Sequence, residues 1–125
     1  MTKKKPWNRI NLPVYSISSK AGDKYNMNIC TYVSAVSMQP KRMMVAVYEN
    51  TKTLGMINSY PHFVLQILAA PQYRLVDLLG KKSGNTIDKI SRLEKRKLLT
   101  EWNGFKVLKN ALTLDDLRKH QLIRI

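Results

Sequence analysis

The sequence has little of what several classes of protein depend on. Its single cysteine, Cys30, excludes a disulfide within the chain. No apolar run approaches the roughly 20 residues that a membrane-spanning helix needs, and no apolar stretch follows the positively charged start of the chain as it would in a secretory signal. We therefore expect a cytoplasmic protein with no membrane partner.

Catalytic, metal-binding and nucleotide motifs are also scarce. The two histidines, His62 and His120, lie far apart and neither is near a nucleophile motif such as Gly-x-Ser-x-Gly. One cysteine, two histidines and eight acids show no zinc or iron ligand spacing. The glycine patterns of Rossmann and P-loop phosphate sites are both missing. No catalytic residue and no metal ligand is predicted.

Acidic residues are scarce relative to basic residues. Only 8 Asp and Glu accompany 22 Lys and Arg, which gives a formal net charge of +14. Such a charge fits an anionic ligand, an acidic partner or nucleic acid. The basic residues cluster at 3–5, 41–42 and 92–97, without the aromatic–basic motif of RNA-binding modules. A solvated basic surface explains the clusters as well.

The pattern of apolar residues predicts one mainly β domain over residues 1–125. We expect strands over residues 12–17, 27–35, 42–48 and 63–68, and a short strand near Phe105 after a turn at Asn103 and Gly104. The run at 42–48, RMMVAVY, is continuously apolar, which predicts a strand buried on both faces.

Short helices are expected between the strands. Thr51 or Thr53 can cap a helix of about two turns that ends before Pro61, and Gly80 is expected at the C′ position of a helix over 73–79. Later segments predict a helix over 87–102, a helical turn capped by Thr113 and an apolar tail over 121–125. A mostly antiparallel barrel or sheet with peripheral helices fits this order better than a doubly wound fold.

One polar constellation offers a binding function. Thr31, Ser34 and Ser37 lie along the predicted second strand, and Asn50-Thr51-Lys52-Thr53 begins the helix that follows. Hydroxyls, the N–H groups of a helix N-terminus and a lysine are the groups that a phosphate monoester requires. Alternatively, a threonine only caps the helix and the hydroxyls face water.

The order and spacing of several pieces between residues 28 and 89 match a known family. The pieces are the Thr-x-x-Ser pattern of Thr31 and Ser34, Ser37 ahead of Pro40, MMVAVY, Lys52-Thr53, Phe63-Val64-Leu65 and the segment LGKKSGNTIDK at 79–89. Together they resemble the flavin reductase-like, FMN-binding split-barrel proteins. The resemblance covers about half of the chain.

The resemblance implies a split β-barrel that binds FMN, or alternatively FAD. The isoalloxazine ring would lie along residues 31–34, which include Tyr32 and Val33, and the phosphate would sit near Ser37 and the helix start at residues 50–53. Lys81, Ser83 and Lys89 would line the mouth. NADH or NADPH would pass a hydride directly to the flavin, and this chemistry needs no acid–base residue of the protein.

Members of this family are commonly homodimers, so the resemblance also implies a homodimer. They continue beyond the element that matches residues 107–112 with strands that complete the barrel, and we expect those strands to be missing here. The alternatives to a reductase are a flavin-binding electron carrier and a basic nucleic-acid-binding module.

Overall fold

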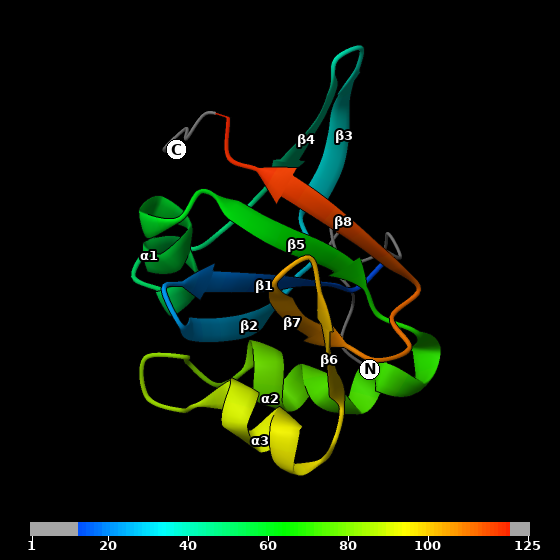
Figure 1. The fold of residues 1–125 in the computed structure, drawn as a ribbon. Helices are drawn as coiled ribbons and strands as arrows, with labels where there is room; N and C mark the ends of the chain where they lie inside the picture. Colours follow the sequence, from blue (N-terminus) through cyan, green and yellow to red (C-terminus); the bar gives the residue numbers. More distant parts are fainter. Residues whose placement is uncertain (1–12, 121–125) are drawn as a thin grey trace, which may run out of the picture.

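The computed structural model describes residues 13–120 and confirms a mainly β protein with peripheral helices (Figure 1). Its strands form three antiparallel sheets with the orders β2-β1-β5-β8, β3-β4 and β6-β7. Within the described residues these sheets do not close, as expected for an incomplete barrel. The elements are β1 (Tyr15–Ala21), β2 (Lys24–Cys30), β3 (Val33–Met38), β4 (Lys41–Val45), α1 (Lys52–Ser59), β5 (His62–Ile67), the 3-10 helix η2 (Ala70–Leu75), α2 (Val76–Gly80), α3 (Lys89–Lys95), β6 (Leu99–Trp102), β7 (Phe105–Leu108) and β8 (Thr113–Arg118).

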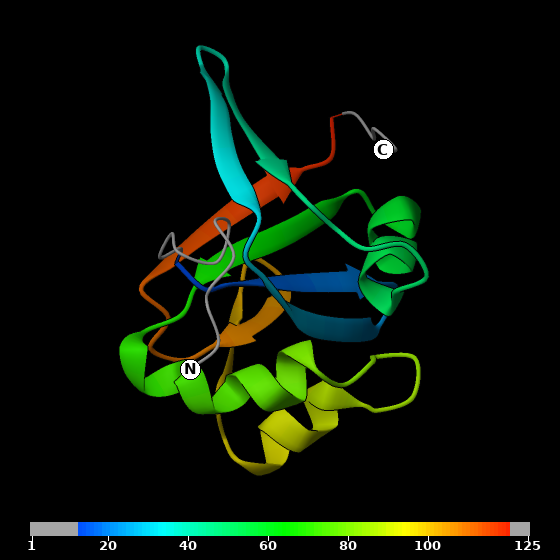
Figure 2. The ribbon, with the colours of Figure 1, turned by 180° about the vertical axis from the view of Figure 1, so that it is seen from behind.

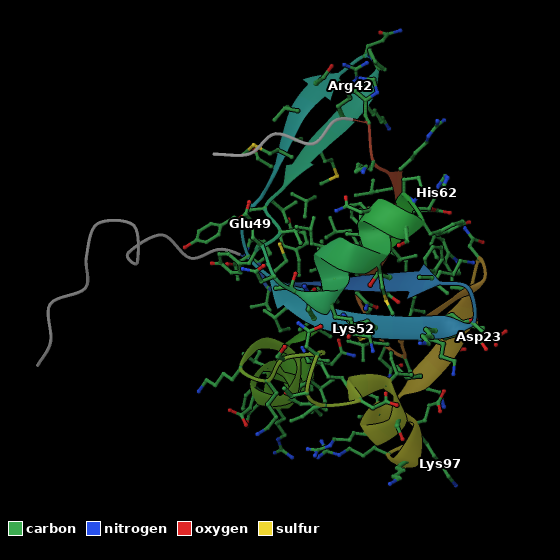
Figure 3. All side chains as sticks on the ribbon, turned by 90° about the vertical axis from the view of Figure 1, so that its left-hand side faces the viewer. Asp23, Arg42, Glu49, Lys52, His62 and Lys97 are labelled. Atoms are coloured by element: carbon green, nitrogen blue, oxygen red, sulfur yellow. The ribbon has the colours of Figure 1, made fainter. Side chains whose placement is uncertain are left out.

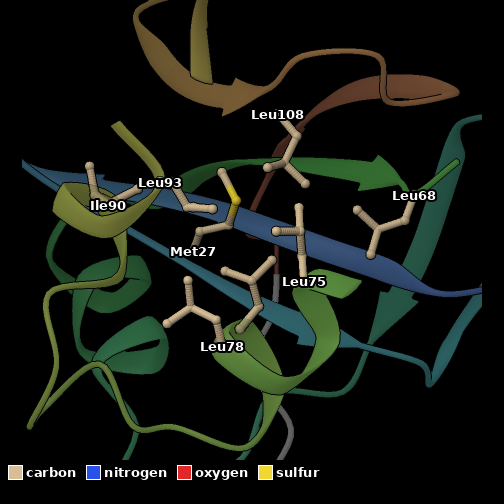
Figure 4. Close-up of a cluster of buried hydrophobic side chains, with 8 residues drawn as sticks. Met27, Leu68, Leu75, Leu78, Ile90, Leu93 and Leu108 are labelled. Atoms are coloured by element: carbon tan, nitrogen blue, oxygen red, sulfur yellow. The ribbon is translucent and has the colours of Figure 1, made fainter. Parts of the chain in front are cut away.

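Helices cover the four-stranded sheet in two places. α1 packs against β1 and β2, where Ile57 joins a buried cluster with Ile17 and Leu65. A second cluster lies between β2 and the layer formed by α2 and α3 (Figures 2 and 4). Its buried members are Met27, Leu68, Leu75, Leu78, Leu79, Ile90, Leu93 and Leu108.

A buried amide attaches the β6–β7 hairpin to the sheet. The Gln66 Nε2 donates to Ser16 Oγ at 3.3 Å, and its Oε1 accepts from the Leu108 N–H at 3.0 Å. Ser18 Oγ donates to the Lys106 carbonyl. These bonds satisfy polar groups that would be costly to bury alone, so the hairpin is held by polar as well as apolar contacts.

The predicted strand over 27–35 is wrong, because two strands occupy this region. Thr31 and Tyr32 separate β2, which stays in the four-stranded sheet, from β3, which pairs only with β4. The alternation of residue types continues through the break, so the pattern could not indicate it.

The predicted burial of residues 42–48 is also wrong. β4 projects with β3 as a hairpin away from the four-stranded sheet (Figures 1 and 2), and most of its residues are exposed. Val33 and Val45, at the base of the hairpin, pack against the cluster under α1, whereas Met38 near the tip is 90% exposed. The apolar run therefore forms a surface rather than a core strand.

Three further predictions in the second half of the chain need correction. The helix over 87–102 is shorter, since α3 ends at Lys95 and β6 follows. The helical turn at Thr113 is strand β8, paired with β5. Gly80 is the last residue of α2 rather than its C′ residue. A Cβ there would lie 3.3 Å from the Ile29 Cβ, so Gly80 permits close helix–strand packing.

Other predictions are confirmed. β5 lies at the expected place, α1 has the expected length, and Thr51 is its N-cap. The turn between β6 and β7 has Asn103 at φ 51° and Gly104 at φ 80°, as two-residue hairpin loops require. Leu12 and the tail at 121–125 lie outside the described residues. Among residues 13–120, no helix combines the length and apolar character needed to cross a membrane.

Candidate functional site

A cavity of about 190 Å³ lies where β2 ends and α1 begins. The two chain segments that form most of its wall are tied together, because the Ala46 N–H donates to the Tyr32 carbonyl at 3.0 Å. Three residues predicted from the sequence, Thr31, Tyr32 and Thr51, meet here. The full lining is Asn28, Ile29, Cys30, Thr31, Tyr32, Ala46, Val47, Tyr48, Thr51 and Gly80.

The start of α1 gives this cavity a positive end. Thr51 Oγ1 accepts from the Leu54 N–H at 3.2 Å and donates to the Tyr48 carbonyl at 2.7 Å. The N–H groups of the first helical residues have no acceptor inside a helix, so those of Lys52 and Thr53 remain as donors. No acidic residue lies in the first turn, and the Lys52 ammonium adds charge to the helix dipole. The helix start therefore favours an anion.

The loop after α2 packs against the same helix start. The Asn85 Nδ2 donates to the Asn50 carbonyl at 3.1 Å, and Ser83 Oγ accepts from the Asn85 N–H at 3.1 Å. Asn50 has φ 59°, a left-handed conformation that asparagine tolerates. The structure thus connects Ser83 to the helix start through Asn85, although Asn85 and Asn50 are 35 residues apart in sequence.

The Gly84→Ala substitution is expected to destabilise the protein by about 1–3 kcal/mol, the usual range for overpacking. An added Cβ would lie 2.6 Å from Asn26 Oδ1 and 3.2 Å from Lys52 Cβ. Asn26 cannot move freely, because its buried Nδ2 donates to Thr53 Oγ1 at 3.0 Å. Urea denaturation of the variant and the wild type measures the change.

Gly55→Ala is the matched control for this substitution. Gly55 lies within α1, and a Cβ there meets nothing within 4 Å. Alanine should stabilise the helix by roughly 0.5–1 kcal/mol. Equal free energies of unfolding for the two variants would contradict the packing of the loop on α1.

Some predicted site residues lie away from the cavity. Ser34 and Ser37 are on the projecting hairpin; the Ser34 hydroxyl donates to the Ala35 carbonyl at 3.2 Å, and Ser37 is paired with Arg42. Val33 packs at the base of the hairpin. The side chain of Thr53 is buried and its Oγ1 accepts from Asn26 Nδ2, so Thr53 can offer only its backbone N–H at the helix start.

The lysines predicted at the mouth differ from one another. Lys81 is exposed and its Nζ lies 3.7 Å from Asp77 Oδ1. Lys89 does not reach a mouth, since it is only 4% exposed and its Nζ donates to the Leu79 carbonyl at 2.7 Å. Burial lowers the pKa of the Lys89 ammonium. Lys89 therefore binds the C-terminal end of α2 inside the protein, whereas the resemblance implied a place at the mouth.

Sequence reasoning missed Tyr48 and Cys30 as residues of the cavity. Tyr48 is 74% exposed and Tyr32, across the tied segments, is 54% exposed. Cys30 is buried, its Sγ lies 3.4 Å from the Ala46 carbonyl oxygen, and burial raises the pKa of its thiol. The only sequence signal for Tyr48 was its place at the end of an apolar run, directly before the polar residues that start α1.

The described residues support neither a metal site nor the second cavity as the functional site. Within 13–120, no three His, Cys, Asp or Glu side chains gather as a metal-binding group. A more open cavity of about 250 Å³ lies between the end of α3 and β6, lined by Glu94, Lys97, Leu99, Thr100, Glu101 and Lys106. Its mixed charges favour neither anions nor cations, so the cavity beside α1 is the better candidate site.

Open antiparallel sheets with peripheral helices define a small domain of the split-barrel type, with a cavity beside a helix N-terminus. The family model described as the flavin reductase like domain matches residues 7–116. The chain therefore belongs to the flavin reductase-like family. Comparison with curated protein sequences gives no match.

Several solved structures share the fold. An FMN-binding protein from Thermus thermophilus with bound 1-cyclohex-2-enone gives a TM-score of 0.83 at 16% identity, over 100% of this chain and 69% of that one. The flavoredoxin of Desulfovibrio vulgaris (Miyazaki F) gives 0.78 at 20% identity, over 99% of this chain and 69% of that one.

An FMN-binding domain of a flavin reductases-like enzyme from Shewanella baltica OS155 gives a TM-score of 0.73 at 20% identity, over 85% of this chain and 56% of that one. This chain thus spans between 56% and 69% of the length of these structures. At such identities the likeness shows the fold.

Proposed function

We propose that this protein binds FMN in the cavity beside α1 and transfers a hydride from NADH or NADPH to the flavin. The observation that carries the proposal is the meeting of Thr31, Tyr32 and Thr51 at one cavity whose positive end is the start of α1. The family match and the FMN-binding proteins that share the fold support it. FAD is the alternative flavin.

The donors at the helix start fit the phosphate of FMN. Phosphate oxygens would accept from the N–H groups of Lys52 and Thr53, and the Lys52 ammonium would offset part of their charge. Asn50 and Ser83 would hold this end through the loop contacts described above, and Lys81 would add charge at the rim. Ser37 has no place in this subsite, since it lies on the hairpin.

The remaining residues would hold the flavin ring. A cavity of about 190 Å³ is smaller than the roughly 300–1,000 Å³ of most cofactor sites, so part of the ligand would lie over the rim. There the backbone of residues 31–34 offers hydrogen bonds, and Tyr32 and Tyr48 offer flat apolar faces. When bound, flavin would supply the redox chemistry, that of a two-electron hydride acceptor for a reduced nicotinamide.

The hairpin supports a homodimer as part of the proposal. Its apolar side chains Val36, Met38 and Met44 are each more than half exposed, and a second copy would bury them. A dimer would bring a second chain close to the cavity, because the hairpin begins at the cavity wall.

Titration of the purified protein with FMN tests the proposal. We expect saturable quenching or shifting of flavin absorbance and fluorescence at micromolar flavin; a linear response without saturation would overturn flavin binding. Oxidation of NADH and NADPH in the presence of bound flavin then tests catalysis. Binding without oxidation of either nicotinamide would show an electron carrier instead of a reductase.

A further inference from the structure

We propose that the outer face of α3, together with the loop before it, binds the phosphate backbone of a double-stranded nucleic acid. This inference does not rest on flavin binding, although the loop before α3 also supplies Lys81 and Ser83 to the proposed flavin site. It concerns the segment over residues 81–97, which is the most basic part of the described chain. Its cations are Lys81, Lys82, Lys89, Arg92, Lys95, Arg96 and Lys97, and its acids are Asp88 and Glu94.

The fold separates the cations of α3 from its apolar residues. Ile90 and Leu93 are buried against the cluster under β2, whereas Arg92, Lys95 and Arg96 are exposed. The spacing of these three residues, i, i+3 and i+4, makes them neighbours on the helix surface. α3 lies at the outside of the molecule in both ribbon views (Figures 1 and 2). One face of α3 is therefore basic and accessible.

The acids of the segment do not neutralise this face. Asp88 caps α3, where its Oδ1 accepts from the Ser91 N–H at 3.0 Å, and Glu94 is paired with Lys106. Among residues 13–120 the remaining ion pair is that of Lys81 with Asp77. Arg92, Lys95 and Arg96 thus have no carboxylate partner in the part of the chain that is described.

This arrangement costs stability in the isolated protein. Like charges three and four residues apart repel one another and destabilise a helix. The helix dipole favours cations in the last turn of α3 and directly after it, and this offsets part of the repulsion. A polyanion would offset the repulsion across the whole face.

The composition of the segment favours a duplex over a single strand. Residues 81–97 contain no aromatic side chain, and proteins that hold single strands stack the bases on aromatic rings. Duplex DNA instead presents about one negative charge per 1.7 Å of axis, which lysines and arginines neutralise without reading the sequence. We therefore expect binding that is independent of sequence.

The test is binding of a labelled 20-base-pair duplex by the full chain over a series of salt concentrations. For the wild type, the affinity should fall linearly with salt on a log–log plot, with a slope of about −0.9 per phosphate neutralised. The R92Q/K95Q/R96Q variant should bind more weakly and show a slope reduced by up to about 2.7. Thermal melting confirms that the variant is folded; if it is not, the double variant R92Q/R96Q tests the same face, with a slope reduced by up to about 1.8.

The matched control removes three cations from the other end of the molecule. Figure 3 places Arg42 at the tip of the hairpin, far from Lys97, so K41Q/R42Q/R118Q changes the net charge equally without touching the proposed face. This control should retain the wild-type slope.

Three outcomes would overturn the proposal. Equal losses in the two triple variants would mean that only net charge matters. Tighter binding of a single strand of the same length would mean that the bases are the ligand. If polyglutamate competes as effectively as unlabelled duplex, the ligand of this face would be an acidic polypeptide.

Discussion

The Lys52→Ala variant is expected to bind FMN about 10- to 100-fold more weakly than the wild type and to bind riboflavin almost equally well. A hydrogen bond to a charged group contributes roughly 1.5–3 kcal/mol, and each 1.4 kcal/mol changes a dissociation constant about tenfold. Riboflavin lacks the phosphate, so the loss of the ammonium should not affect it. Fluorescence titration with both flavins measures the difference.

Lys24→Ala is the control for this prediction. Lys24 is exposed at the start of β2, whereas the cavity lies at the other end of that strand, around residues 28–32. Its removal lowers the net charge by the same amount and should leave both affinities unchanged. Equal weakening of FMN and riboflavin by Lys52→Ala would mean that Lys52 supports the structure of the cavity rather than the phosphate.

The Leu93→Ala variant should lose about 2–5 kcal/mol of unfolding free energy, the usual cost of removing a large buried side chain. Leu93 is fully buried in the cluster between β2 and the α2–α3 layer (Figure 4). The substitution would leave a cavity, and the side chains of both layers would lose their contacts with Leu93. The midpoint of urea denaturation, with an unchanged slope, measures the loss.

Met38→Ala provides the comparison on the surface. Met38 is near the tip of the hairpin and almost fully exposed, so its truncation should change the stability of the monomer by no more than about 0.5 kcal/mol. A loss similar to that of Leu93→Ala would show that the hairpin is covered in solution.

The parts of the site that sequence could predict are those fixed by local chemistry. Thr51 caps α1 because a threonine followed by a short apolar pattern and a proline defines a helix start whatever surrounds it. Such reasoning could not find the contact between Asn85 and Asn50, which depends on how a distant loop folds back. Likewise, nothing local distinguishes an exposed Lys81 from a buried Lys89.

The errors in the fold have the same origin. Leu114 and Leu117 are three residues apart, as on a helix, yet pairing with β5 makes this segment strand β8. β4 has the apolar residues of a buried strand. Its exposure depends on the direction in which the hairpin projects, which the pattern of residues does not indicate. In both segments, tertiary contacts overrode the structure that the local pattern of residues predicts.

The same two chain segments form the base of the hairpin and part of the wall of the cavity. β3 leaves the cavity wall after Tyr32, and the chain returns from β4 to the wall at Ala46, with one hydrogen bond between the two. A change in the tilt of the hairpin would therefore move the two segments that line the cavity. If two copies form a dimer through their hairpins, dimer formation and flavin binding would be thermodynamically linked. The affinity for flavin would then change with protein concentration. By the same linkage, flavin would change the dissociation constant of the dimer by the same factor.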